Sequence, residues 1–214
     1  MRLRSDEFGL LIFGIYDPTI VSVHLNKWRI KMKICVLFGG QHKKGNTAAL
    51  LGQFLEGATA KGHAVRRFDV AFMDIRPCLG CMGCKKKGNG CVQKDDMNAI
   101  YDAIKESDMI VLSSPMYWWN LSGPLKNVVD RFFALPFNTQ IESSAFAGKK
   151  LMLIMTSGQP RERDGSEGLQ AILEKMCSFT GMEWAGILST GTGTRAIAEQ
   201  NDVLKDAYER GLAL

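Results

Sequence analysis

The sequence has no long apolar run. None reaches the roughly 18 residues that a membrane span requires, and the longest candidate, residues 8–16, stops at Asp17 and Pro18. A secretory signal is not expected either, because Asp6 and Glu7 precede this run and no small-residue cleavage site follows it. These absences predict a cytoplasmic protein that does not enter a membrane.

Cysteine is scarce and the charge is nearly balanced. Six cysteines among 214 residues fall well short of the roughly 8–10% of a disulfide scaffold. The net charge of +5 is too small to indicate a nucleic-acid partner, since the densest basic run is only Lys85-Lys86-Lys87. No Ser-His-Asp set or histidine cluster supports a hydrolase. We therefore expect an ordinary globular protein that does not bind nucleic acid.

Strand-like and helix-like segments alternate from Met32 onward, and several strand candidates are short, continuous apolar runs. This pattern predicts an α/β fold, a doubly wound parallel sheet of five strands with helices on both faces. Ligands of such sheets bind at the carboxyl ends of the strands. The expected strands are 33–38, 64–70, 109–113, 151–156 and 184–188, and the expected helices are 47–61, 97–106, 121–134, 167–180 and 196–210.

Residues 1–31 show no clear period, whereas residues 32–38 have the pattern of a buried strand that opens a domain. We therefore expect residues 1–31 to be an N-terminal extension outside the functional unit, and residues 32–214 to form one domain.

The loop at residues 39–47 follows the first expected strand and leads into a helix. Such a loop binds anions, because free amides and the positive end of the helix dipole face the ligand. Asn46 stands where a nucleotide-triphosphate loop has its lysine, and the dinucleotide fingerprint is missing, so a terminal monophosphate fits best. A plain turn with Thr47 as helix cap is the alternative. The candidate ligands are Gly40, Gln41, His42, Lys43, Gly45, Asn46 and Thr47.

Three consecutive aromatic residues leave the third expected strand. Aromatic rings at this edge of a sheet can flank a flat ligand ring, and a flavin suits that description. The alternative is that these rings only cap the core or lie in a subunit interface. The candidate ring contacts are Pro115, Met116, Tyr117, Trp118 and Trp119.

Four cysteines, Cys78, Cys81, Cys84 and Cys91, lie within one short segment that also contains four glycines. Three cysteines at this spacing occur in the segment that wraps a [4Fe-4S] cluster in ferredoxins. Free or redox-active thiols are a second interpretation, and zinc is a third, although structural zinc usually takes two well-separated pairs. The spacing alone leaves these alternatives open.

Three motifs together resemble the NAD(P)H-dependent FMN reductases of the flavodoxin-like proteins, and among them the iron-sulfur flavoproteins. The motifs are the loop at 39–47, the segment 115–119 with the helix that follows it, and the cysteine segment through Met97. The resemblance implies a flavodoxin-like fold in which the FMN phosphate lies on residues 40–47 and the flavin ring lies against residues 116–119. It also implies that the loop with Ser157 and Gly158 approaches the ring from the other side, and that the four cysteines are the iron-sulfur ligands.

The leading hypothesis is an FMN-dependent NAD(P)H oxidoreductase that reduces a quinone, a flavin or another small acceptor. No catalytic side chain is expected, because the flavin carries the chemistry. The alternative is an electron carrier in which FMN and a [4Fe-4S] cluster pass electrons to a redox protein partner. A homodimer or homotetramer is expected from the resemblance.

Four further residues are predicted to be structural. Cys35 and Cys177 lie in strand and helix patterns and are expected in the core. Asp95 and Asp96 precede an expected helix, so an N-cap and a first-turn charge are predicted for them.

Overall fold

A computed structural model describes residues 31–86, 90–136, 144–160, 163–193 and 195–214. Met32–Leu214 form one compact unit. The predicted extension lies almost wholly outside the described residues, so its role stays a prediction. No helix within the described ranges is long and apolar enough to cross a membrane.

The described residues form a five-stranded sheet in which every pair of neighbouring strands is parallel, in the order β2-β1-β3-β4-β5. This order is that of flavodoxin, so the predicted flavodoxin-like fold is confirmed. The chain reverses its direction of winding between β1 and β3, which marks the edge where a ligand is expected. The strands are β1 (Lys33–Phe38), β2 (Ala64–Asp69), β3 (Met109–Pro115), β4 (Lys150–Ser157) and β5 (Glu183–Gly191).

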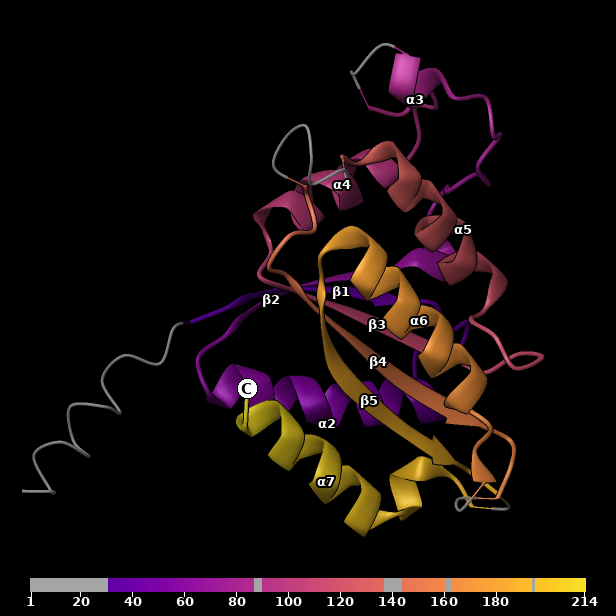
Figure 1. The fold of residues 1–214 in the computed structure, drawn as a ribbon. Coiled ribbons are helices and arrows are strands. Elements are labelled where there is room, and N and C mark those ends of the chain that lie inside the picture. The colour runs from indigo at the N-terminus through magenta and orange to yellow at the C-terminus, as the bar shows by residue number, and fades with distance from the viewer. Residues whose placement is uncertain (1–30, 87–89, 137–143, 161–162, 194) are drawn as a thin grey trace, which may run out of the picture. The chain divides into compact units, whose positions relative to one another are not determined.

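Helices cover both faces of the sheet (Figure 1). One face packs against α2 (Asn46–Ala60) and α7 (Asn201–Leu212). The other packs against α4 (Met97–Glu106), α5 (Gly123–Arg131) and α6 (Glu167–Thr180). The shorter elements are α3 (Gly83–Lys86) and the 3-10 turns η2 (Val70–Phe72), η3 (Phe132–Ala134) and η5 (Ile197–Glu199).

Two expected helices differ from the structure by more than one residue at both ends. The helix expected over 121–134 begins at Gly123, because Ser122 at its N-cap has a ψ of 148° and is not helical, and it ends at Arg131, after which the turn η3 begins. The helix expected from residue 196 begins at Asn201, because the turn η5 comes first.

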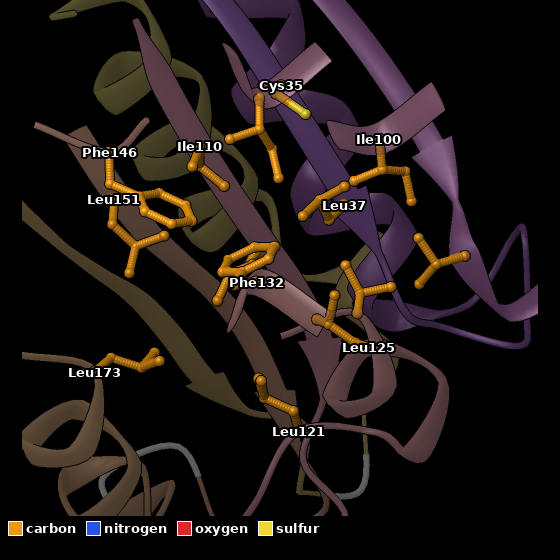
Figure 2. Packing of buried hydrophobic residues seen from close by; sticks show 14 of the residues in the cluster. Cys35, Leu37, Ile100, Ile110, Leu121, Leu125, Phe132, Phe146, Leu151 and Leu173 are labelled. Carbon is orange, nitrogen blue, oxygen red and sulfur yellow. The ribbon is translucent and has the colours of Figure 1, made fainter. Parts of the chain in front are cut away.

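The core has two layers because successive strand residues point to opposite faces. On β1, Cys35 and Leu37 face α4 and α5, whereas Val36 and Phe38 face α2. Figure 2 shows Leu37, Leu125 and Phe132 within the first layer. Cys35 and Cys177 are buried, as predicted, and burial raises the pKa of Cys35 to about 12 and that of Cys177 to about 11.

The helices α2 and α7 touch at two glycines. A Cβ atom on Gly57 would lie 2.1 Å from the carbonyl oxygen of Tyr208, and one on Gly211 would lie 2.0 Å from that of Phe54. The two backbones are therefore close enough to exclude any side chain at either position.

Candidate functional site

The loop between β1 and α2 forms the floor of the site. Gly45 is the N-cap of α2 and no side chain caps this helix, so the alternative in which Thr47 serves as the helix cap is wrong. Thr47 lies inside the first turn instead, where its buried hydroxyl shares a 2.7 Å hydrogen bond with the hydroxyl of Thr156 on β4. The carboxamide oxygen of Asn46 accepts a 2.9 Å bond from the backbone N–H of Ile197. Both side chains thus tie the start of α2 to neighbouring elements.

A first cavity of about 260 Å³ opens above this loop, at the carboxyl ends of β1, β3 and β4. It brings together most of the site residues that the sequence predicts. From those predictions, its lining contains Gly40, Gln41, His42, Gly45, Asn46, Thr47, Pro115, Met116, Tyr117, Ser157 and Gly158.

The lining differs from the prediction at one residue of the first loop. Lys43 does not line the cavity; its ammonium group lies 4.6 Å from the centre of the Phe72 ring. Three lining residues were not among the predicted ligands: Phe38, Thr192 and Thr156, which begins the loop that the resemblance brings to the ring. Thr192 lies between two glycines directly after β5. Because the carboxyl end of β5 lies at the same edge of the parallel sheet, the loop after this strand could have been predicted to reach the site.

A second cavity of about 120 Å³ adjoins the first, with which it shares Met116, Ser157 and Gly158. Trp118 and Trp119 line this second cavity and not the first. The two tryptophans therefore lie at the predicted edge of the sheet, at the carboxyl ends of the strands. The lining residues are Met116, Trp118, Trp119, Ser157, Gly158 and Gln159.

The two tryptophans occupy a strained turn. Tyr117 and Asn120 exchange backbone hydrogen bonds of 3.0 and 3.1 Å, while Trp118 and Trp119 between them have φ values of 51° and 58°. A two-residue turn with positive φ at both central positions normally carries Asn-Gly. Non-glycine residues in this conformation cost about 1–2 kcal/mol each. Trp118 at this turn is almost fully exposed to solvent, at 91%.

The loop after β4 forms the opposite wall, and a partly buried network of hydrogen bonds holds it. Asp164 accepts a 2.6 Å bond from the Ser189 hydroxyl and a 2.9 Å bond from the Ser166 backbone N–H. Burial alone would raise the pKa of Asp164, but these hydrogen bonds more than offset it and hold the pKa below its usual value. A Cβ on Gly165 would lie 3.1 Å from the Trp119 indole nitrogen, so the two walls of the second cavity approach closely.

The strand order and a cavity at the point where the winding reverses define a flavodoxin-like protein. The family model of the NADPH-dependent FMN reductases matches residues 32–183. The chain belongs to this family.

Individual relatives agree with this assignment. The chain is 25% identical to an iron-sulfur flavoprotein of Methanosarcina thermophila, over 83% of this chain and 96% of the relative. It is 31% identical to an iron-sulfur flavoprotein of Archaeoglobus fulgidus, over 63% of this chain and 60% of the relative. In four curated iron-sulfur flavoproteins that match, the matched part spans only 52% to 60% of the relative's own length.

A solved structure supports the fold. An NAD(P)H:quinone oxidoreductase from Methanothermobacter marburgensis superposes with a TM-score of 0.64 at 19% identity, covering 86% of this chain and 96% of that one. At this identity the likeness concerns the fold alone.

The cysteine segment follows β2 and precedes α4 in the chain, and it is separate from the two cavities above. In Figure 1, α3 of this segment lies beyond α4 and α5. All four cysteines line one cavity of about 30 Å³, the cysteine cavity. Cys78 and Cys81 are exposed at its rim, whereas Cys84 and Cys91 are partly buried. Within the described ranges, no three Cys, His, Asp or Glu side chains gather as the ligands of one metal ion do.

A buried ion pair stands behind the cysteine cavity, and the sequence did not reveal it. Arg131 donates hydrogen bonds of 2.8 and 3.1 Å to the two carboxylate oxygens of Asp95, and both side chains are at most 1% exposed. Asp95 also accepts bonds from the backbone N–H groups of Arg76 and Met97. The N-cap of α4 is Asp96, which makes no side-chain cap hydrogen bond, and the first turn contains no acidic residue, so the predicted capping side chain and first-turn charge are wrong. The Asp95 carboxylate accepts a bond from the Met97 N–H at the start of α4, but its main partner is 36 residues away in the sequence.

Proposed function

We propose that this protein is an FMN-dependent NAD(P)H oxidoreductase. The observation that supports this most strongly is the pair of adjoining cavities. The first lies at the N-terminus of α2 and contains hydroxyl and amide donors, as a phosphate requires, and the second lies between two tryptophans and the loop after β4. The polar first cavity fits the phosphate and the ribityl chain of FMN, and the aromatic second cavity fits its ring.

Each group of residues has a distinct part in this proposal. The backbone amides of residues 40–47 and the Thr47 hydroxyl hold the phosphate, and Thr156 and Ser157 face the ribityl chain. Met116, Trp118 and Trp119 lie along one side of the ring, and the loop at 157–159 lies along the other. Bound FMN supplies a ring that accepts a hydride from NAD(P)H and passes the electrons to a quinone, a flavin or another small acceptor.

The protein's contribution is to position the ring and to leave it accessible. The Asp164 network fixes one wall, and the strained turn fixes the other. Tyr117 and Trp118 remain exposed at 45% and 91%, so a substrate can reach the cavity from solvent. A homo-oligomeric assembly and a cytoplasmic location stay predictions.

Titration with FMN and with riboflavin tests the proposal. We expect one FMN per chain and a clearly weaker affinity for riboflavin, because the first cavity is suited to a phosphate. Thr47→Val removes one hydroxyl at nearly constant size and should raise the Kd for FMN at least about tenfold, the weight of a hydrogen bond to a charged group. Loaded protein should oxidise NADH or NADPH in the presence of a quinone.

The control is Thr59→Val, which makes the same change at the exposed far end of α2 and should leave the Kd unchanged. Equal affinity for riboflavin and FMN, or an unchanged Kd in Thr47→Val, would show that the phosphate lies elsewhere. Tight FMN binding without any oxidation of NADH or NADPH would refute the enzyme and favour the carrier.

A second candidate function is electron transfer through a [4Fe-4S] cluster held by Cys78, Cys81, Cys84 and Cys91. The observation that favours it is that all four thiols line the cysteine cavity, whose wall is otherwise mostly apolar. A cluster takes four cysteine thiolates, and Cys78 and Cys81 lie at the exposed rim, where widening the cavity disturbs little of the core. The cluster would exchange single electrons with a protein partner.

Iron analysis after anaerobic reconstitution tests this second function. We expect about four iron and four sulfide per chain, and loss of most of the iron when Cys84 is replaced by Ser. Cys177→Ala, a change in the buried core cysteine outside the segment, serves as the control and should keep its iron. If the reconstituted protein contains no iron and its four thiols titrate as free thiols, the cluster is refuted and the reductase function stands without it.

A further inference from the structure

Two buried hydroxyl groups from distant parts of the chain meet in the wall of the first cavity. Thr47 lies in the first turn of α2 and Thr156 lies near the end of β4, and both line the cavity although they are only 6% and 4% exposed. Their oxygen atoms are 2.7 Å apart, and either hydroxyl can be the donor of this bond. Among the described residues, neither hydroxyl has a second hydrogen-bond partner. One of the two protons therefore remains for a group that enters the cavity.

Thr156 is held in place by the sheet. β4 lies between β3 and β5, where Pro115 and Thr190 are the register partners of Thr156. The backbone oxygen of Thr156 accepts a 2.8 Å bond from the N–H of Met116, and a β-branched side chain has few χ1 rotamers. The Thr156 hydroxyl is thus presented to Thr47 from a rigid part of the fold.

The chemistry of a phosphate decides the direction of the shared bond. The first N–H groups of α2 have no partner within the helix, and the helix dipole is positive at this end, so an anion is stabilised beside Thr47. The first turn of α2 contains no acidic residue that would oppose it. Unprotonated phosphate oxygens only accept hydrogen bonds, and a hydroxyl has one proton to donate. When Thr47 donates to the phosphate, Thr156 must therefore supply the proton of the shared bond.

We propose that Thr156 is a positioning residue of the phosphate site. Its hydroxyl donates to the Thr47 oxygen, and this bond turns the Thr47 proton toward the phosphate. A hydroxyl that accepts a hydrogen bond is also polarised and becomes a stronger donor. The preference for FMN over riboflavin then depends on β4 as well as on the loop at 40–47. The inference rests on the FMN-dependent oxidoreductase proposed above.

The test compares the Kd values for FMN and for riboflavin in Thr156→Val and Thr156→Ser. The valine variant removes the hydroxyl at nearly constant size, and its preference for FMN should fall about three- to tenfold, the weight of one ordinary hydrogen bond. The serine variant keeps the hydroxyl and should restore most of the preference. Because Thr156 acts through Thr47, adding Thr156→Val to Thr47→Val should weaken FMN binding little further.

The matched control is Thr190→Val on the neighbouring strand. Thr190 is also buried, but its hydroxyl donates to the carbonyl oxygen of Gly191 and its side chain does not line the first cavity. This variant should keep the wild-type preference for FMN.

Three results would overturn the inference. An unchanged preference in Thr156→Val would mean that its hydroxyl has no part in phosphate binding. Equal weakening of FMN and riboflavin would mean that the hydroxyl contacts the ribityl chain directly, and additive losses in the double variant would mean that the two threonines act independently. Wild-type protein that binds both flavins equally would instead remove the phosphate site of the proposed function, so the two failures are distinguishable.

Discussion

Replacing Arg131 by Met is expected to lower the free energy of unfolding by about 3–5 kcal/mol. The variant keeps most of the side-chain volume but leaves the Asp95 carboxylate buried, at 0% exposure, without its main partner. A buried charge that loses its partner is one of the most destabilising changes in a protein interior. Urea unfolding of the two proteins at neutral pH measures the difference.

A matched variant on the same helix is Lys126→Met. Lys126 pairs with Asp130 one turn along α5, but both side chains are 46% exposed, and exposed pairs contribute between 0 and about 1 kcal/mol. Comparable losses in Arg131→Met and Lys126→Met would contradict the importance of the buried pair.

The loss in Arg131→Met should also depend on pH. Burial by itself would raise the pKa of Asp95, but the hydrogen bonds from Arg131, Arg76 and Met97 outweigh it and hold the pKa below its ordinary value. A carboxyl with a lowered folded-state pKa stabilises the protein fully above its unfolded pKa of about 3.9, and the contribution disappears as pH falls through the folded value. The difference between wild type and variant should therefore narrow below about pH 4.

The second large effect is expected from Gly57→Ala, which should destabilise the protein by about 3 kcal/mol. Its new methyl group would lie 2.1 Å from the Tyr208 carbonyl oxygen, so α7 must move away from α2, and overpacking of this kind costs about 1–3 kcal/mol or more. Thermal and urea unfolding measure the loss.

The same helix offers the opposite case. Gly52 has no atom within 4 Å of the position that a Cβ would take, so Gly52→Ala should stabilise the protein by roughly 0.5–1 kcal/mol through helix propensity alone. The same substitution at these two positions of α2 should thus change the free energy of unfolding in opposite directions. A stabilised Gly57→Ala would show that the two helices are not in contact at this glycine.

The sheet could be predicted from the sequence because several of its strands are continuous apolar runs bounded by polar loops. The strand Lys33–Phe38 and the helices Met97–Glu106 and Glu167–Thr180 have the predicted bounds. The loops that form the two cavities were also found, since each one directly follows a recognisable strand and the parallel order brings their ends together.

Contacts between distant segments could not be read from local patterns. Asp95 has the appearance of a helix cap, and nothing near it in the sequence announces Arg131 as its partner. Thr47 is a residue type that often caps a helix, but its hydroxyl hydrogen-bonds to the hydroxyl of Thr156 instead. Lys43 lies in a phosphate-type loop, but the Phe72 ring attracts its ammonium group. Each of these outcomes depends on tertiary neighbours that only the folded chain supplies.

The Trp118–Trp119 turn has an evolutionary consequence. Random substitution toward Asn and Gly at these two positions would relieve the positive-φ strain, so a lineage selected for stability alone would drift to that pair. Two large indoles in this backbone conformation are what selection for a bound aromatic ring, as proposed above, would maintain. A family member that has lost its flavin should be recognisable by an Asn-Gly turn at this point in its chain.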